Sequence, residues 1–196
     1  MPSARTASRL LALHRDAVRV RDGLFSRAVA ASFGSFGAGS VLALPVRLIG
    51  PERIHVGAGV YVGSASWLRV GGEDPDARLE LGDGCRISGH AVLSAVRSVR
   101  LGRSVLVARG VHVTDHDHRH DRPGVPVLDQ GVARVGPVWI GDGAWLGSHV
   151  VVGPGVTIGA GAVIGAGSVV RDDVPAGAVA VGAPARVVRT REAVSV

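Results

Sequence analysis

The sequence predicts an all-β fold, a parallel β-helix of about five triangular coils with an N-terminal helical cap and a protruding loop. Aliphatic residues recur at every sixth position between residues 140 and 170, a period that fits neither a helix nor a simple alternating strand. Gly supplies 29 of the 196 residues, and aromatic residues only 4%. That much Gly disfavours a helical bundle, because each Gly inside a helix costs about 1 kcal/mol relative to Ala. The period and the composition together indicate stacked hexapeptide repeats.

The clearest run of the repeat lies near the C-terminus. Five of its six aliphatic residues are followed by Gly, and a small or β-branched residue stands two positions before each. We expect the aliphatic side chains to point inward and the Gly that follows each of them to let the backbone turn a corner. Three hexapeptides then make one triangular coil of 18 residues. The six aliphatic residues are Ile140, Leu146, Val152, Ile158, Ile164 and Val170.

The same spacing continues upstream in groups of three. Each break in the spacing follows the third member of a group, so the insertions should all protrude from one edge of the prism. Stacked coils would bury a continuous aliphatic column, and each buried side chain contributes roughly 1.5 to 3 kcal/mol. Cys85 occupies a small-residue position before Ile87, which predicts a buried structural thiol. The upstream aliphatic residues are Val56, Val62, Leu68, Leu81, Ile87, Leu93, Leu101, Val107 and Val113.

These patterns divide the chain into three parts. Residues 1–32 form an amphipathic helical segment, residues 47–175 the β-helix with its protruding loop at 114–137, and residues 176–196 a tail. We expect one or two helices in the first part to cap the first coil with their apolar face. The alternative is that this basic segment lies on an anionic membrane surface, which we do not expect. Its apolar residues are Leu10, Leu11, Leu13, Val18, Leu24, Phe25 and Val29.

Charge and cysteine content exclude several classes of protein. The net charge is +6, and all 22 basic residues are Arg. Residues 1–30 hold six Arg and two Asp, or +4, which leaves +2 on the remainder. The part of the chain after residue 30 is nearly neutral and has no aromatic residues interleaved with basic ones, which disfavours nucleic-acid binding. The single Cys excludes an internal disulfide, and Arg interrupts every apolar stretch near the N-terminus, so we expect no secretory leader and a cytoplasmic protein.

Residues 143–170 carry no Asp, Glu, Lys or Arg. Hydropathy alone would predict a membrane-spanning segment there. Its glycines and its six-residue period predict β-coils instead.

The longest insertion contains the residues best suited to chemistry. It opens with Thr-Asp-His-Asp-His-Arg-His-Asp at residues 114–121, and a loop of this length in a compact fold is usually functional or disordered. His exchanges protons near neutral pH. Three interpretations remain open from the residues alone: a general base with supporting carboxylates, a metal site built from three His at a spacing of two, and a solvated polar loop.

Three segments together resemble the hexapeptide-repeat acyltransferases. They are the hexapeptide run, the Thr-Asp-His-Asp-His segment, and the closing Gly-Ala-Gly-Ser-Val-Val and Gly-Ala-Pro-Ala-Arg-Val-Val-Arg segments. The resemblance covers about residues 47–190 and is strongest to the maltose and galactoside O-acetyltransferases and the exopolysaccharide and capsule O-acetyltransferases. It implies a left-handed β-helix, a homotrimer, and acetyl-CoA bound in the groove between neighbouring prisms. Because the His cluster lies in an insertion and not on the coils, we expect no metal.

The resemblance also implies roles for individual residues. His116 would be the general base that removes the proton of an acceptor hydroxyl. Trp145 has a second interpretation, packing at the seam of the trimer, and Arg171 would replace a Lys that many members carry at the neighbouring position 172, which is Asp here. Residues expected to orient His116 or meet the acceptor are Asp115, Asp117 and His118, with Ser88, His90, Asp129 and Gln130 as further acceptor candidates. Residues expected to bind CoA are Trp145, Ser148, Ala166, Arg171, Arg186 and Arg189.

The sequence therefore predicts an acetyl-CoA-dependent O-acetyltransferase acting on a saccharide or glycoconjugate hydroxyl. An acyltransferase acting on an antibiotic, another secondary metabolite or an amino sugar is an alternative of the same class. A non-catalytic β-helix scaffold is the alternative of a different class, because a β-helix alone is compatible with many functions.

Overall fold

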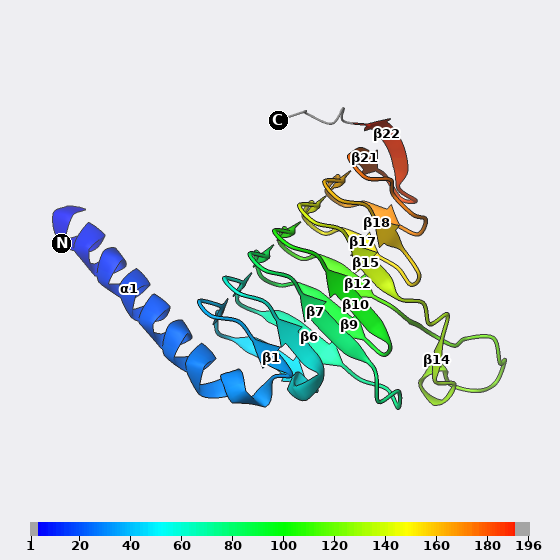
Figure 1. Ribbon diagram of the computed structural model, residues 1–196, viewed down its shortest axis with the longest axis horizontal. Coiled ribbons are helices and arrows are strands. Elements are labelled where there is room, and N and C mark those ends of the chain that lie inside the picture. Colours follow the sequence, from blue (N-terminus) through cyan, green and yellow to red (C-terminus); the bar gives the residue numbers. More distant parts are fainter. Residues whose placement is uncertain (1–3, 191–196) are drawn as a thin grey trace.

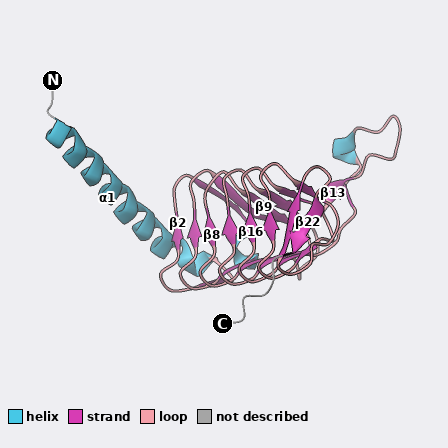
Figure 2. Ribbon diagram, turned by 90° about the horizontal axis from the view of Figure 1, so that it is seen from above, coloured by secondary structure: helices cyan, strands magenta, loops and turns pink. Residues whose placement is uncertain are grey.

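The chain folds into a triangular prism of stacked coils with a long helix at one end (Figure 1). The computed structural model describes residues 4–190. Figure 2 shows the coils side by side, with helix α1 (Ala4–Val29) leaving the prism at the first coil and a long loop leaving it near the other end. The prediction of a left-handed parallel β-helix is confirmed.

In residues 4–190 the strands form three parallel sheets, one for each side of the prism, and one small hairpin. Sheet A contains β1 (Ser35–Phe36), β4 (Ile54–Val56), β7 (Arg78–Leu81), β10 (Ser98–Leu101), β15 (Val138–Ile140) and β18 (Thr157–Ile158). Sheet B contains β2 (Val41–Leu42), β5 (Tyr61–Val62), β8 (Arg86–Ile87), β11 (Leu106–Val107), β16 (Trp145–Leu146), β19 (Val163–Ile164), β21 (Ala178–Val181) and the antiparallel β22 (Arg186–Thr190).

Sheet C contains β3 (Val46–Ile49), β6 (Ser66–Val70), β9 (Val92–Ala95), β12 (His112–Thr114), β17 (Val151–Val152) and β20 (Val169–Val170). The hairpin joins β13 (Asp117–His118) to β14 (Val132–Ala133). Three short 3-10 helices, η1 (Ala30–Ser32), η2 (Pro51–Arg53) and η3 (Val127–Asp129), lie in the connections.

The inward residues form three columns along the prism axis. All 15 aliphatic residues of the predicted repeat are at most 3% exposed. Strand pairing places them in register: Leu101 lies opposite Leu81 and Ile140 on sheet A, and Val113 lies opposite Leu93 and Val152 on sheet C. Cys85 is also fully buried, and burial raises the pKa of its thiol. The predicted core and the structural thiol are therefore confirmed.

The β-helix begins earlier than the sequence boundary at residue 47. Strands β1 to β3 form a complete coil before the five predicted ones, and its members Phe36, Leu42 and Leu48 keep the spacing of six. This coil escaped a count of aliphatic residues because its first inward residue is aromatic. At the other end, Ala180 pairs with Ile164, so sheet B extends into the predicted tail; residues 191–196 of that tail lie outside the described residues.

The glycines of the repeat act differently from the expectation. The Gly that follows an inward residue does not carry the left-handed backbone. Gly141 is needed for close approach, because a Cβ there would lie 2.5 Å from the backbone nitrogen of Ala160 on the next coil. The left-handed residue comes three positions before the inward residue, as at Gly143 (φ 66°) before Leu146. That position is also where His149 adopts a φ of 59°.

Helix α1 caps the first coil with its C-terminal end only. The backbone N–H of Leu42 donates to Ser26 Oγ (2.8 Å), and that of Leu44 donates to Asp22 Oδ1 (3.3 Å). Phe25 and Val29 pack against the core.

The rest of α1 departs from the predicted cap. It projects away from the prism (Figures 1 and 2), and its leucines are 59–71% exposed at Leu10, Leu11, Leu13 and Leu24. In the described part of the chain no helix, α1 included, combines the length and the hydrophobicity needed to cross a membrane.

The inward columns make a stability prediction that one pair of substitutions tests. Leu146→Ala removes a side chain that is 0% exposed, whereas Leu106→Ala removes one that is 43% exposed on the neighbouring strand of the same sheet. We expect the first to lower the free energy of unfolding by about 2–5 kcal/mol and the second by less than about 1 kcal/mol. Denaturant unfolding followed by circular dichroism measures both, and equal losses would contradict the assigned register.

Candidate functional site

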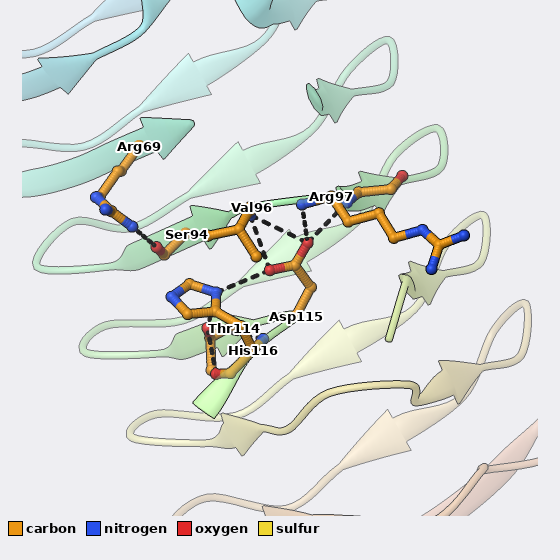
Figure 3. A network of polar contacts seen from close by, with 8 residues as sticks. Arg69, Ser94, Val96, Arg97, Thr114, Asp115 and His116 are labelled. Carbon is orange, nitrogen blue, oxygen red and sulfur yellow. Dashed lines mark hydrogen bonds and ion pairs between the residues drawn. The ribbon is translucent and has the colours of Figure 1, made fainter. Parts of the chain in front are cut away.

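The long insertion leaves the prism directly after β12, and His116 stands at its start. The adjacent Asp115 is fully buried, and its Oδ1 lies 2.8 Å from His116 Nδ1. An ionised carboxylate can only accept hydrogen bonds, so this contact places the proton of the neutral imidazole on Nδ1. Figure 3 shows the second ring nitrogen pointing away from Asp115. Nε2 is therefore left with a lone pair that can accept a proton.

Asp115 is held by the coil below it. Its carboxylate accepts backbone N–H bonds from Val96 (2.9 Å) and Arg97 (2.8 Å), in the turn between β9 and β10, and from Ser98 (2.7 Å), the first residue of β10. These three N–H groups lie at a corner of the prism. The Asp115 carboxylate accepts their hydrogen bonds, as the carbonyl oxygens of a paired strand would elsewhere in the sheet. Burial raises the pKa of Asp115, but the hydrogen bonds from His116 and from the backbone outweigh it and hold the pKa below its ordinary value.

Two neighbours complete the surroundings of the imidazole. The Thr114 hydroxyl donates to the His116 carbonyl oxygen (3.1 Å) and lies 3.1 Å from Nδ1. His112, on the same strand as Thr114, has its pKa lowered by burial and by the nearby His116, so it is neutral at pH 7. Neither Thr114 nor His112 was singled out from the sequence; their position on a strand whose alternate residues face outward was the available signal.

A pocket of about 950 Å³ runs from this corner along the outer face of sheet C towards the C-terminal coils. Thr114 and Asp117, on either side of His116 in the chain, line one end, and Arg171, Asp172 and Arg186 line the other. Arg134, which no sequence pattern marked, lines the pocket from the segment after β14. The pocket therefore joins the surroundings of His116 to two guanidinium groups.

The protruding loop is an ordered hairpin for part of its length. Asp117 and His118 form β13 and pair with Ala133 and Val132 of β14. Gln130 uses its side chain inside the loop, where its amide donates to the carbonyl oxygens of Arg122 (3.1 Å) and Val125 (2.7 Å).

The remaining acceptor candidates differ in position. Asp129 is exposed on the same loop as Gln130. Ser88 and His90 are exposed on the turn between β8 and β9, which joins sheet B to sheet C. That turn is at a different edge of the prism from His116, so one chain does not bring Ser88 and His90 to the imidazole.

The CoA candidates fall into two groups. Arg171 and Arg186 line the pocket, and Arg186 is paired with Asp172 at 2.8 Å, both side chains being largely exposed. The second group lies on sheet B or at the corner between sheets B and C. Trp145 is 47% exposed on β16. Ser148 and Ala166 follow β16 and β19, and Arg189 lies on β22.

The metal interpretation of the sequence concerned three His at a spacing of two. Within residues 4–190, no cluster of three or more His, Cys, Asp or Glu side chains is arranged to hold a metal ion. Of the three His at a spacing of two, His116 precedes the short strand β13, His118 lies in it and His120 follows it, and His116 already contacts Asp115.

The sequence of the last complete coils matches a known family. Residues 137–172 match the family described as "Bacterial transferase hexapeptide (six repeats)". The chain is also 36% identical over 140 residues to "Probable acetyltransferase Rv3034c" of Mycobacterium tuberculosis. That match covers 71% of this chain and 45% of the relative, so the chain spans less than half the length of the curated relative it matches. The chain is therefore similar to bacterial hexapeptide transferases over residues 137–172 and to a named acetyltransferase over 140 residues.

Solved structures share the hexapeptide-repeat fold. AntD, an N-acyltransferase from Bacillus cereus solved with dTDP and coenzyme A, superimposes with a TM-score of 0.73 at 20% identity, covering 85% of this chain and 89% of its own. PerB from Caulobacter crescentus, solved with CoA and GDP-perosamine, gives a TM-score of 0.58 at 25% identity, covering 87% and 65%. The hexapeptide-repeat acetyltransferase VCA0836 from Vibrio cholerae gives 0.59 at 23% identity, covering 89% and 91%.

The branch expected from the sequence, that of the maltose, galactoside and polysaccharide O-acetyltransferases, is not distinguished by these relatives. AntD is described as an N-acyltransferase, and both AntD and PerB were solved with a nucleotide or a nucleotide-linked sugar.

Asp115→Asn should destabilise the protein at neutral pH by about 1–3 kcal/mol, because an amide cannot accept the full set of N–H bonds. The pKa of Asp115 is lowered from its ordinary value of 3.8. The stability from its carboxylate is therefore present above about pH 4 and is lost as the pH falls through the lowered native value. The difference in the free energy of unfolding between Asp115→Asn and the wild type should therefore be smaller at about pH 3 than at neutral pH.

Denaturant unfolding at both pH values measures this difference. Asp121→Asn, at an exposed position of the protruding loop, is the matched control and should change little. A difference for Asp115→Asn that does not depend on pH would contradict a buried, ionised carboxylate.

Proposed function

We propose that the protein is an acetyl-CoA-dependent acyltransferase that acetylates a sugar, with His116 as the general base. The observation that carries this proposal is the imidazole of His116, fixed by a buried carboxylate and flanked by two residues of a 950 Å³ pocket that ends at two arginines. The named acetyltransferase relative and the acyltransferase neighbours support it.

The proposed step is a proton transfer coupled to attack on a thioester. Nε2 of His116 takes the proton of the acceptor hydroxyl or amine as its oxygen or nitrogen attacks the acetyl carbonyl carbon. The tetrahedral intermediate collapses, the carbon–sulfur bond breaks, and the imidazolium returns the proton to the leaving thiolate. Asp115 keeps the imidazole in the required tautomer and stabilises the imidazolium that forms. A base of this kind contributes about 10² to 10⁴ in rate.

The donor would lie along the outer face of sheet C. Arg171 and Arg186 at the far end of the pocket are suited to the phosphates of CoA, because guanidinium groups form charge-assisted hydrogen bonds to phosphate oxygens. Asp172 pairs with Arg186, and because that pair is exposed it is weak and easily exchanged for a phosphate.

The separation of the two groups of CoA candidates favours an assembly. Trp145 and Ser148 lie on or beside sheet B, whereas Arg171 and Arg186 line a pocket along sheet C, which Arg186 reaches from the start of the edge strand β22. If both groups bind one CoA, they come from neighbouring copies of the chain, which agrees with the homotrimer that the resemblance implies. Homotrimer and cytoplasmic location stay predictions of the sequence.

The acceptor has two candidate chemistries. A saccharide hydroxyl follows from the resemblance to O-acetyltransferases. An amino group on a nucleotide-linked sugar is favoured by AntD, described as an N-acyltransferase and bound to dTDP, and by PerB, bound to GDP-perosamine. The same base serves either acceptor, so the geometry at His116 is compatible with both.

His116→Ala should lower the rate of acetyl transfer by about 10² to 10⁴, because the reaction loses its base. The affinity for acetyl-CoA and the circular dichroism spectrum should remain those of the wild type. His120→Ala, on an exposed position of the same loop, is the matched control and should keep its activity. Activity of His116→Ala close to the wild-type rate would exclude the proposed base.

Arg186→Ala should weaken CoA binding about tenfold or more, the usual effect of losing a charged hydrogen bond. Asp172→Asn should tighten CoA binding, because the substitution removes the carboxylate that pairs with Arg186. Calorimetric titration with CoA measures both, with Arg15→Ala on the exposed face of α1 as the control for a lost positive charge. An unchanged dissociation constant for Arg186→Ala would remove it from the donor site, and no CoA binding by the wild type would favour the scaffold alternative.

A further inference from the structure

A second group of cations lies on the other side of His116 from the pocket. The outward residues of sheet C form two rows across the coils. In one row Ile49, Arg69, Ser94 and Thr114 lie side by side by strand register, and Thr114 contacts His116. Arg69 Nη1 donates to Ser94 Oγ at 3.2 Å, and Figure 3 shows this contact beside the imidazole. A guanidinium group is thus two coils away from Thr114 on the same face.

Arg69 has no counter-ion among the described residues. None of their ion pairs within 4 Å involves it, and the six strands of sheet C contain no Asp or Glu. The second row adds another cation, Arg47, whose guanidinium lies 4.5 Å from the centre of the Trp67 ring. This part of the face therefore presents positive charge and an aromatic ring next to the proposed base.

Gly71 leaves the space that the Arg69 guanidinium occupies. A Cβ at position 71 would lie 2.6 Å from Nη2 and 2.7 Å from Cζ of Arg69. The backbone at Gly71 is not left-handed, since Gly71 is absent from the positive-φ residues. A side chain at position 71 would therefore require the Arg69 guanidinium to move.

We propose that Arg69 binds an anionic oxygen group of the acceptor, a phosphate or a carboxylate, and so selects a charged sugar. This inference rests on the proposed acetyl transfer at His116. An unpaired, half-buried guanidinium gains most from a partner with two oxygens, because its planar donors match phosphate and carboxylate geometry. Trp67, partly exposed in the neighbouring row, carries the Arg47 guanidinium over its ring and so adds a second cation to the same face.

Four probes distinguish the sources of the anion: methyl glucoside as the neutral reference, glucose 1-phosphate, UDP-glucose, and glucuronic acid. Calorimetric titration of the CoA-bound protein, which cannot transfer an acetyl group, gives the dissociation constant of each. We expect at least one anionic probe to bind about tenfold or more tightly than methyl glucoside, the size of effect that a charged hydrogen bond provides. Which probe binds best tells a sugar phosphate from a nucleotide-linked sugar or a sugar acid.

Two variants and one control link the preference to Arg69. Arg69→Gln should abolish the preference for the anionic probe, and Gly71→Ala should reduce it by displacing the guanidinium while keeping its charge. Arg86→Gln, on the outer face of sheet B, should leave it unchanged. All variants should retain the acetyl-CoA dissociation constant of the wild type.

Two results overturn the inference if the protein still binds acetyl-CoA. One is that all four probes bind equally or not at all, and the other is that the preference for the anionic probe survives Arg69→Gln. Loss of acetyl-CoA binding by the wild-type protein is a separate result, which contradicts the proposed function itself.

Discussion

Three columns of inward side chains hold the coils in register, and the position of every other residue depends on them. A slip of one residue in any strand would turn an aliphatic side chain to the surface and a polar one into the core. The spacing of six prevents this, because each side of the prism then begins at the same point of the repeat. Leu101, for example, lies between Leu81 and Ile140, although 38 residues, the long loop among them, separate Leu101 from Ile140 in the sequence.

The proposed active site is a local exception that the register makes possible. Because β9 and β12 are paired residue by residue, the residue just beyond β12 lies beside the turn that follows β9. Asp115 occupies that place and accepts hydrogen bonds from three backbone N–H groups, two in the turn and one at the start of β10. A buried carboxylate without such partners would be costly, and here the same hydrogen bonds that pay its desolvation also fix the orientation of His116.

Much of the fold could be predicted from the sequence because it is periodic. The inward residues from Val56 to Val170 follow from spacing alone, whereas the coil of Phe36, Leu42 and Leu48 was missed because an aromatic residue begins it. The role of Gly141 could not be predicted, because it depends on the distance to Ala160 on the next coil, which residue spacing in the sequence does not reveal.

The candidate site was less predictable, because its contacts join residues of different coils. The chain marks Asp115 and His116 as neighbours, but the partners Val96 to Ser98 come from another coil. Arg69 lies 47 residues before His116, and only strand register brings the two to one face. The exposed leucines of α1 fit the amphipathic pattern expected of a cap, and a pattern does not show how far a helix extends beyond the surface that it covers.

The insertions have one further consequence. Each leaves the prism between sheets C and A, whereas the coils from β15 to β20 run without interruption. Loops at that edge can lengthen, shorten or change composition over evolutionary time without moving any inward residue. A lineage of such proteins can therefore diversify what it recognises beside His116 while the uninterrupted coils are inherited unchanged.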